Sequence, residues 1–552
     1  VRATVVNREA VRLRGTVRLA GIDGWSAEPR DGVPFDLPRK GSAEMSFRVR
    51  PAADTVDGHY PLRAVATATA GDERREARAV LLVEAAPAGT PTPTVPSLPV
   101  LIPADGALAP TAFPPGEHDA PRTLGSVRCG GTSWEVLLWP GRRGLLDAAV
   151  GFRAGDRLLC FHGFRITVLG AELSDPRSVA TVEDVREDSE GGWLSFRHAC
   201  RGPDGRFTVI VALRADGQAL QARIGLQGVS VASPWRDAHL ERVELGPWSE
   251  RVARVYAGPG NVLDPPAAFD LPFDGHRLAT SFAGFEFAGG LAVLEAVDVP
   301  PGGLRADPAT RSCALYAAGA QTLTLIPATD AWEGLRTWRA RDGLARAGGV
   351  ERLAGRFVFD LWGERVAAKA LPALERSFRY GLTDAVVIWH DWQRWGYDNR
   401  LPDIWPPNPA RGAPEELAAL ARACERRGAL FALHDNYIDL YPDAEAFTYD
   451  DVAFDAAGRP VRAWYNEWRK AQSYRWRPDR MRGALERNLR LIRTGVAPTA
   501  YFIDVWSSVA PHDWWTRSGT YHAARDTRKQ WRDAFAWIRG FLGHDAPQIS
   551  ES

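Results

Sequence analysis

The first part of the chain alternates apolar and polar residues in short runs. Residues 11–14 and 77–83 are two such runs, and the second becomes fully apolar at its end. Gly and Pro interrupt the pattern at short intervals, as expected for strands separated by turns. Residues 1–84 therefore predict a small immunoglobulin-like β-sandwich. Residues 85–120 are rich in Pro, Ala, Thr and Gly, and they predict a stiff extended linker.

From residue 121 to residue 330 the period of two continues. Strand candidates include 134–139, 206–213 and 218–226, and Asp216-Gly217 is a hairpin turn signal between the last two. The region shows no helical period of any length. A region of this size with only strand signals predicts a large two-sheet sandwich.

Near residue 331 strand and helix patterns begin to alternate. Helices are predicted at 331–347, 363–378, 414–427, 478–494 and 521–542, and strands at 357–361, 384–389, 429–433, 500–505 and 547–550. The strands are short and mostly apolar, which is typical of parallel strands buried on both faces. The fold class is thus multidomain β plus α/β, and residues 331–552 are predicted to form a (β/α)8 barrel of the TIM type.

On this interpretation the barrel is truncated after about five strands, and about three more are expected beyond Ser552. A doubly wound sheet is the alternative fold. No Gly-rich phosphate loop follows the first strand, which disfavours it.

Charge and composition narrow the classes of partner. Lys and Arg total 68, as do Asp and Glu, so nothing electrostatic favours nucleic acid or an anionic membrane. No apolar run reaches the ~18 residues that a membrane-spanning helix needs. The chain begins at Val1 without a leader and both ends look cut, so missing targeting signals carry little weight. We expect a secreted or periplasmic protein.

Trp and Cys add to this picture. The 21 Trp residues are dense between Trp389 and Trp531. Indole faces can pack on the C–H faces of sugar rings, although large β domains also bury Trp. The five Cys residues are widely spaced and lack a C-x-x-C pair, which argues against a structural zinc site and leaves room for one disulfide within 129–313.

Polar residues collect where the predicted parallel strands end, which is where barrel enzymes place their chemistry. The strand ends carry His390-Asp391, His434-Asp435-Asn436-Tyr437, Asp504 with Trp506, and Glu551. One acidic strand end is commonly a helix cap or a salt bridge. Four in succession favour function.

Glycosidic cleavage is the chemistry that uses such an arrangement. One carboxylate must be ionised beside the anomeric carbon, and a second must be protonated near the leaving oxygen. Asp504 and Glu551 lie on neighbouring predicted strands, which are ~4.8 Å apart. This spacing favours the close pair, ~5–5.5 Å apart, of retaining enzymes. Aromatic neighbours such as Trp506 would desolvate the acid.

Residues 384–552 resemble the retaining α-N-acetylgalactosaminidases of glycoside hydrolase families 129 and 101. The matching residues are His390-Asp391, Tyr397-Asp398, His434-Asp435-Asn436-Tyr437, Tyr441-Pro442, Tyr501-Phe502-Ile503-Asp504-Val505 and Ser550-Glu551. The resemblance implies that Asp504 is the nucleophile, Glu551 the acid/base, and Asp391 a residue that holds sugar hydroxyls. It also implies a β-sandwich ahead of the barrel. The first 84 residues are similar to β modules attached to α-galactosidases.

Other residues at the strand ends complete the predicted substrate site. His390, Asp435, Asn436, Tyr437, Trp395 and Trp506 are assigned to sugar binding, although His434, Asn436, Tyr437 and Tyr441 are equally compatible with loop support. Trp464, Trp468 and Trp476 are candidates for a substrate wall. No cofactor or metal is required. Calcium at the loop Asp435, Asp439, Asp443 and Glu445 is a weaker interpretation than a solvated acidic loop.

The predicted function is therefore a retaining glycosidase acting on α-linked galactose-type sugars, carried by a carbohydrate or a glycoprotein glycan. Two alternatives remain. The first is a carbohydrate-binding protein with an inactive barrel. The second is an α-galactosidase-like hydrolase with a different acid, although the usual Lys-x-Asp motif reads Phe502-Ile503-Asp504 here.

Overall fold

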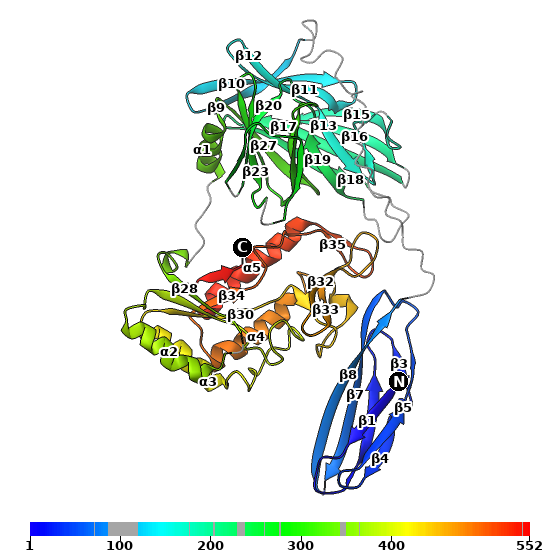
Figure 1. Ribbon diagram of the computed structural model, residues 1–552. Coiled ribbons are helices and arrows are strands. Elements are labelled where there is room, and N and C mark those ends of the chain that lie inside the picture. The colour runs from blue at the N-terminus through cyan, green and yellow to red at the C-terminus, as the bar shows by residue number, and fades with distance from the viewer. Residues whose placement is uncertain are drawn as a thin grey trace.

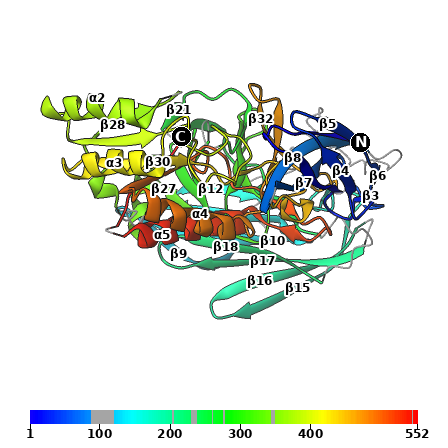
Figure 2. The same cartoon turned by 90° about the horizontal axis from the view of Figure 1, so that it is seen from below.

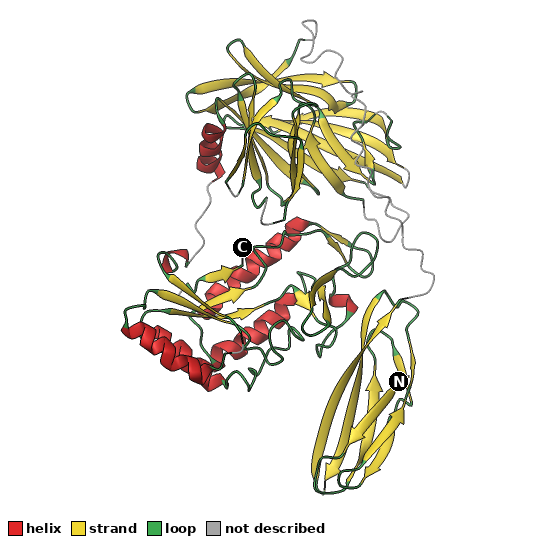
Figure 3. Ribbon diagram, in the orientation of Figure 1, coloured by secondary structure: helices red, strands yellow, loops and turns green. Residues whose placement is uncertain are grey.

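The protein is described by a computed structural model. It describes residues 1–70, 72–86, 120–175, 177–202, 205–228, 238–258, 260–274, 278–342, 349–363, 365–543 and 545–551. Strands dominate, and the longer helices gather in the C-terminal part (Figure 3). The linker predicted at 85–120 lies almost entirely outside the described residues.

The N-terminal residues form antiparallel sheets. Their strands are β1 (Arg2–Val6), β2 (Leu13–Ala20), β3 (Ser26–Glu28), β4 (Val33–Leu37), β5 (Ser42–Ser46), β6 (Arg48–Arg50), β7 (Gly58–Ala70) and β8 (Glu73–Ala85). The largest sheet has the order β4-β2-β7-β8, while β1 pairs with β5 and β3 with β6. Trp25 and Tyr60 stack in the core between them, with ring centroids 4.5 Å apart.

The middle of the chain is also antiparallel. Its strands are β9 (Arg122–Cys129), β10 (Thr132–Gly141), β11 (Gly144–Ala154), β12 (Arg157–His162), β13 (Phe164–Val168), β14 (Ala171–Glu172), β15 (Thr181–Glu190), β16 (Trp193–Gly202), β17 (Gly205–Ala215), β18 (Leu220–Gln227), β19 (Leu240–Leu245), β20 (Val252–Ala257), β21 (Asn261–Leu263), β22 (Phe269–Pro272), β23 (Phe282–Phe287), β24 (Ala292–Val297), β25 (Pro301–Asp307), β26 (Ser312–Ala317) and β27 (Gln321–Ala328).

These strands form large sheets around one apolar core (Figure 1). One sheet has the order β15-β16-β17-β18-β27-β24-β23-β20-β21, and a second has the order β14-β13-β19-β26-β25-β22. The hairpin predicted at Asp216-Gly217 is confirmed, because β17 and β18 pair across that turn. Helix α1 (Ala331–Asp342) packs on β24 and β27, burying Gly334 against Leu294. The predicted domain boundary lies at residue 330, directly before α1, yet this helix packs on the sheet that precedes the boundary. The division into domains stays a prediction.

All five Cys residues are buried free thiols in the structure, so the disulfide considered within 129–313 is absent. Cys160 lies on β12 and Cys313 on β26, inside the apolar part of the sheets. Burial raises the pKa of the Cys160 thiol to about 12, which keeps it protonated and unreactive.

The C-terminal part contains a parallel sheet of β28 (Phe357–Leu361), β29 (Ala385–Trp389), β30 (Leu430–Asp435), β34 (Ala500–Ile503) and β37 (Gln548–Ser550), in that order. Helices α2 (Ala367–Arg379), α3 (Pro414–Glu425), α4 (Met481–Gly495) and α5 (Ala524–Leu542) connect the strands (Figure 1). The strands predicted from the sequence are confirmed within two residues at every boundary. The connections between the parallel strands contain the short strands β31 (Asp439–Leu440), β32 (Arg462–Asn466), β33 (Ala471–Arg475), β35 (Trp514–Trp515) and β36 (Tyr521–His522). One-turn helices lie at Val350–Arg352, ahead of β28, and at Tyr449–Asp451, between β31 and β32.

The two faces of the parallel sheet bury different residues. Val387, Leu433 and Ile503 join the core that contains the helices, whereas Val386, Ala432 and Phe502 form a separate cluster on the other face. Because successive side chains point to opposite faces, this division fixes which residue of each strand end faces away from the helices.

Candidate active site

One polar residue from each of the five parallel strands, or from its immediate end, falls on the face away from the helices. The alternation that places Val386, Ala432 and Phe502 on this face continues to His390, His434 and Asp504. On β28 the same alternation of side chains places Asp360 on the face of Val358. After β37 it places Glu551 on the face of Ile549. Asp360, His390, His434, Asp504 and Glu551 are called the strand-end cluster below.

At one side of the cluster, Asp360 and His390 form a tight pair. His390 Nε2 lies 2.5 Å from Asp360 Oδ1, and Trp362 Nε1 donates to Asp360 Oδ2 at 2.6 Å. The Trp362 ring stacks on His390 with centroids 3.8 Å apart, yet 48% of the Trp362 residue stays exposed. Trp362 therefore offers a partly open aromatic face beside a carboxylate.

His434 occupies the centre of the cluster. Its ring centroid lies 4.3 Å from that of His390 and 5.2 Å from that of Phe502. Burial lowers the pKa of His434 to about 3 and that of His390 to about 4, so both rings are neutral at pH 7. His434 Nε2 is 3.5 Å from Asp504 Oδ2, but among the described residues neither His434 nitrogen has a hydrogen-bond partner. Such nitrogens can donate to or accept from a ligand hydroxyl.

Asp504 and Glu551 are in direct contact. A hydrogen bond from the Glu551 side chain lowers the pKa of Asp504, although burial, the larger effect, raises it. Two carboxyl groups this close titrate as a coupled pair, which favours a state in which one is protonated and the other ionised. Tyr397 also donates to Asp504 Oδ2, at 3.5 Å. This arrangement supplies the unequal protonation that glycosidic cleavage uses.

Glu551 is exposed at the end of a three-residue strand, whereas Asp504 is 6% exposed. Ser507 donates to the Glu551 carbonyl oxygen and links the loop after β34 to β37. Two carboxyl groups joined by a hydrogen bond lie closer together than the ~5–5.5 Å of a retaining pair. A sugar ring between them would require the Glu551 side chain to turn away from Asp504.

A buried polar layer lies beneath Tyr397. Asp398 and Asp439 are 6% and 4% exposed, and burial together with their mutual repulsion raises the pKa of Asp398 well above its usual range. Asn436 Nδ2 donates to Asp439 Oδ2 at 2.7 Å, and Asn436 also bonds to Asp398. Ser473 donates to Asp439 Oδ1 at 2.6 Å. Asn436, predicted to bind substrate, therefore holds this layer together.

Asp391 lies next to the cluster with its carboxylate already bonded. Oδ1 accepts from Tyr397 N at 2.9 Å and Oδ2 from Arg411 Nε at 2.8 Å. Its backbone φ is 54°, in the left-handed region. The side chain thus fixes the loop that carries Tyr397, and its predicted contact with sugar hydroxyls stays a prediction.

Asp435 faces the helices, because it lies two residues after Leu433 on the same strand and therefore points to the same face. It is fully buried, accepts from Tyr501 OH at 2.6 Å, and is also bonded to Tyr437. Burial raises the pKa of Asp435 to about 6. Tyr437 is buried beside Asn488 on α4, 3.3 Å from its Nδ2. Asp435 and Tyr437 therefore lie on the face of the sheet that the helices cover. The residue of this strand end that faces the cluster is His434.

The predicted aromatic contacts divide into buried and accessible ones. Trp506 packs on α5, stacked with Trp531 at 5.7 Å. The guanidinium groups of Arg394 and Arg400 lie 4.7 and 4.4 Å from the Trp395 ring centroid. Trp476 is buried, but Trp464 and Trp468 are 58% and 96% exposed.

No group of three or more His, Cys, Asp or Glu side chains within the described ranges has the arrangement of a metal site. The carboxylates of the predicted calcium loop have separate partners: Asp443, for example, pairs with Arg400 at 2.8 Å. These residues do not fit a shared ion.

Three residues of the cluster region, Asp360, Trp362 and His434, were not assigned to substrate from the sequence. Asp360 had a signal, since it is a carboxylate within the apolar strand 357–361. That Asp360 and His390 lie on the same face of the sheet is seen only once the register of β28 against β29 is known.

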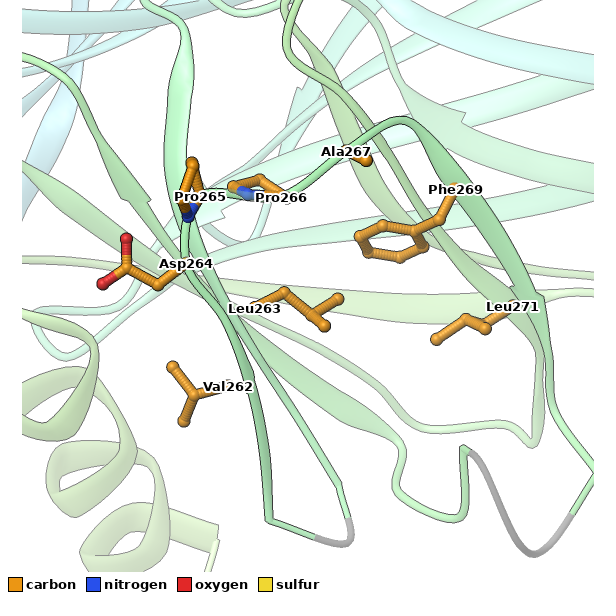
Figure 4. A pocket seen from close by; sticks show the side chains of 8 residues that line it. All are labelled: Val262, Leu263, Asp264, Pro265, Pro266, Ala267, Phe269 and Leu271. Carbon is orange, nitrogen blue, oxygen red and sulfur yellow. The ribbon is translucent and has the colours of Figure 1, made fainter.

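A separate hollow of about 340 Å³ lies on the β part of the chain and is lined by Val262, Leu263, Asp264, Pro265, Pro266, Ala267, Phe269 and Leu271 (Figure 4). Its one charged side chain, Asp264, pairs with Arg254. No strand-end residue lines it, so it is no part of the candidate site. In the described part of the chain, no helix is both long and apolar enough to cross a membrane.

No family model and no curated protein sequence matches the chain. Solved structures do resemble it. The α-N-acetylgalactosaminidase NagBb from Bifidobacterium bifidum, in complex with GalNAc, has a TM-score of 0.59 at 14% identity, over 77% of this chain and 76% of that one. Its complex with Gal-NHAc-DNJ gives a TM-score of 0.58 with the same identity and coverage.

The GH36 α-galactosidase AgaA from Geobacillus stearothermophilus gives a TM-score of 0.45 at 12% identity, over 77% of this chain and 72% of that one. The similarity to NagBb confirms, at the level of fold, the resemblance predicted from the sequence.

Proposed function

We propose that this protein is a retaining glycoside hydrolase that cleaves α-linked galactose-type sugars, N-acetylgalactosaminides foremost. The observation that carries the proposal is the strand-end cluster, in which five neighbouring parallel strands each contribute one polar residue to the same face. Within it, a hydrogen bond links the side chains of Asp504 and Glu551. Asp504 is the nucleophile in this proposal and Glu551 the acid/base. The fold shared with NagBb supports the choice of sugar.

The mechanism follows from the different surroundings of the two carboxyls. Glu551, on the exposed side, protonates the leaving oxygen while Asp504 attacks the anomeric carbon and forms a glycosyl-enzyme. Glu551, now ionised, then removes a proton from water, which attacks the same carbon and releases the sugar with its configuration retained.

The other residues of the cluster would bind the sugar. In this proposal Trp362 packs on a C–H face, while Asp360, His390 and His434 exchange hydrogen bonds with ring hydroxyls. The neutral imidazoles suit this role because each can both donate and accept. Asp391, Asn436 and the Tyr397–Asp398 loop position the site around them.

The proposed fold of this part is a (β/α)8 barrel. Its support is the single parallel sheet with helices on one face. In the described residues, β28 and β37 each pair on one side only, and a closed barrel would add strands between them. The proposal includes a secreted or periplasmic location, where glycoprotein glycans would be met.

The test is a screen of aryl α-glycosides, with the N-acetylgalactosaminide first and the galactoside second. We expect turnover by the wild type and a loss of about a thousandfold or more for Asp504→Asn, because the covalent step is removed. Asp533→Asn, on the exposed face of α5 beside Lys529, is the matched control and should keep full activity. Binding of these sugars without turnover would support a carbohydrate-binding protein instead. Turnover of the galactoside alone would support the α-galactosidase-like alternative.

A further inference from the structure

The β32–β33 hairpin carries three exposed aromatic side chains. Trp464, Tyr465 and Trp468 are 58%, 41% and 96% exposed, and they are called the aromatic ridge below. The hairpin lies between the parallel sheet and the N-terminal sheets (Figures 1 and 2). Such exposure is unusual for Trp, which normally buries its large apolar surface.

Two hydrogen bonds connect the ridge to the candidate site. Asn466, between the exposed rings, donates through Nδ2 to the Asp398 carbonyl oxygen at 3.0 Å. Trp464 N donates to Asp439 Oδ1 at 3.3 Å. Since Asp398 follows Tyr397, which contacts Asp504, the ridge begins within a few residues of the proposed nucleophile.

The backbone beneath the ridge is fixed although its rings are exposed. Ser473 is fully buried, and its hydroxyl oxygen, which donates to Asp439, lies 2.9 Å from the Trp464 carbonyl oxygen. Arg469 N donates to Asn466 Oδ1 at 3.1 Å and closes the turn. A fixed frame lets the rings bind a ligand with little loss of backbone entropy.

The residues around the rings point to the chemistry of the ligand. The exposed neighbours are polar or charged, among them Arg462, Glu467 and Lys470. A large continuous apolar patch, which often marks a site for a protein partner, would not be broken up by these charged side chains. Separate aromatic faces among hydrogen-bonding groups instead suit sugar rings, which present C–H faces edged by hydroxyls.

We infer that the aromatic ridge is a binding site for the glycan beyond the scissile bond, where it stacks on sugar units of an oligosaccharide whose terminal residue occupies the strand-end cluster. This inference rests on the proposed function. It adds that the natural substrate is an extended glycan.

The test compares Trp468→Ala and Trp464→Ala with Tyr380→Ala, a matched control. Tyr380 is 82% exposed at the C-terminal end of α2, in the connection between β28 and β29, whereas the ridge lies in the connection between β30 and β34. The substrates are an α-glycosyl fluoride, which has no aglycone ring, and an oligosaccharide of several units ending in the same α-linked sugar. We expect the ridge variants to raise KM for the oligosaccharide about tenfold, as for loss of one stacking contact, and to leave the fluoride unchanged. Equal effects on both substrates, or no effect, would overturn the inference.

A second readout does not depend on turnover. In the Asp504→Asn background, affinity electrophoresis through a gel containing a glycoprotein measures binding directly. The ridge variants should be retarded less than the background, and the difference should vanish with the deglycosylated protein. Persistence of the difference would assign the ridge to peptide and contradict a glycan site. If no α-glycoside is hydrolysed but glycan-dependent retardation is lost in the ridge variants, the proposed hydrolase fails while the glycan site stands.

Discussion

His434 shows how burial sets the chemistry of a single residue. The ring is fully buried among His390, Tyr397 and Phe502, and its pKa falls to about 3. The pKa of the folded state thus lies below the ~6.5 of an unfolded histidine. Between these values the unfolded chain binds more protons, so stability is full above pH 6.5 and is lost as pH falls towards 3.

We predict that His434→Phe weakens this dependence. Removing the titrating ring should flatten the fall of the free energy of unfolding between pH 7 and pH 5 by up to about 1.4 kcal/mol per pH unit. The measurement is Tm against pH for both proteins. Parallel curves would mean that the buried His434 does not resist protonation.

The sequence located the ends of the parallel strands but not which residue of each end faces away from the helices. Both residues of His390-Asp391 were taken as substrate contacts, and in His434-Asp435 it was Asp435 that was assigned to the sugar. Because both faces of the sheet are apolar, the alternation along one strand does not tell the inner face from the outer face. Only the separate packing of Val386 and Val387 makes that distinction.

At the scale of elements, the loop after β29 depends on the pair of Asp391 and Arg411. Their bond of 2.8 Å, together with the bond from Tyr397 N, fixes the loop that contacts Asp504. We predict that Arg411→Ala lowers kcat about tenfold or more on every substrate, because Tyr397 is displaced. Arg426→Ala, which breaks an exposed pair with Glu375, should have no effect.

Asp391→Asn separates positioning from sugar contact. A positioning residue should reduce activity on a galactose-type sugar and on its epimer by the same factor. A larger loss for one epimer would support the direct contact predicted from the sequence. The kinetics of both variants on the two aryl glycosides make the comparison.

Strands and helices were predicted unequally well. The strand predicted at 357–361 was located to the residue, and its start coincides with the first apolar residue after Arg356. The starts of α2, α4 and α5 lie three or four residues later than predicted. Helix α3 was placed correctly at its start, since Pro414 at its first position and the bond from Ala413 N to Glu416 mark it.

At the scale of the molecule, the N-terminal sheets are joined to the candidate site through the connection after β30 (Figure 2). His59 N donates to Tyr474 OH at 3.0 Å, and Asp23 accepts from Thr448 and Tyr449 at 2.7 and 3.0 Å. Tyr474 belongs to β33, whose hairpin carries the aromatic ridge. No pattern in the sequence predicts this contact, because it joins residues hundreds of positions apart.

We predict that Gly58→Ala disturbs this interface. A Cβ at Gly58 would lie 2.0 Å from Tyr449 Oη, whereas a Cβ at Gly131 has nothing within 4 Å. Gly58→Ala should therefore destabilise the protein by about 1–3 kcal/mol, and Gly131→Ala should not. Calorimetry should also show that the N-terminal sheets unfold together with the α/β part. A separate transition for these sheets, unchanged by Gly58→Ala, would contradict a joined core.

The central claim is that Asp504 and Glu551 act as nucleophile and acid/base of a retaining enzyme. In Glu551→Ala, an activated aryl α-glycoside needs little protonation and should still form the glycosyl-enzyme, which then accumulates for want of a base. Azide needs no base and should restore turnover. NMR of the product is the decisive measurement: we predict the α-glycosyl azide, and a β-glycosyl azide would contradict the assignment.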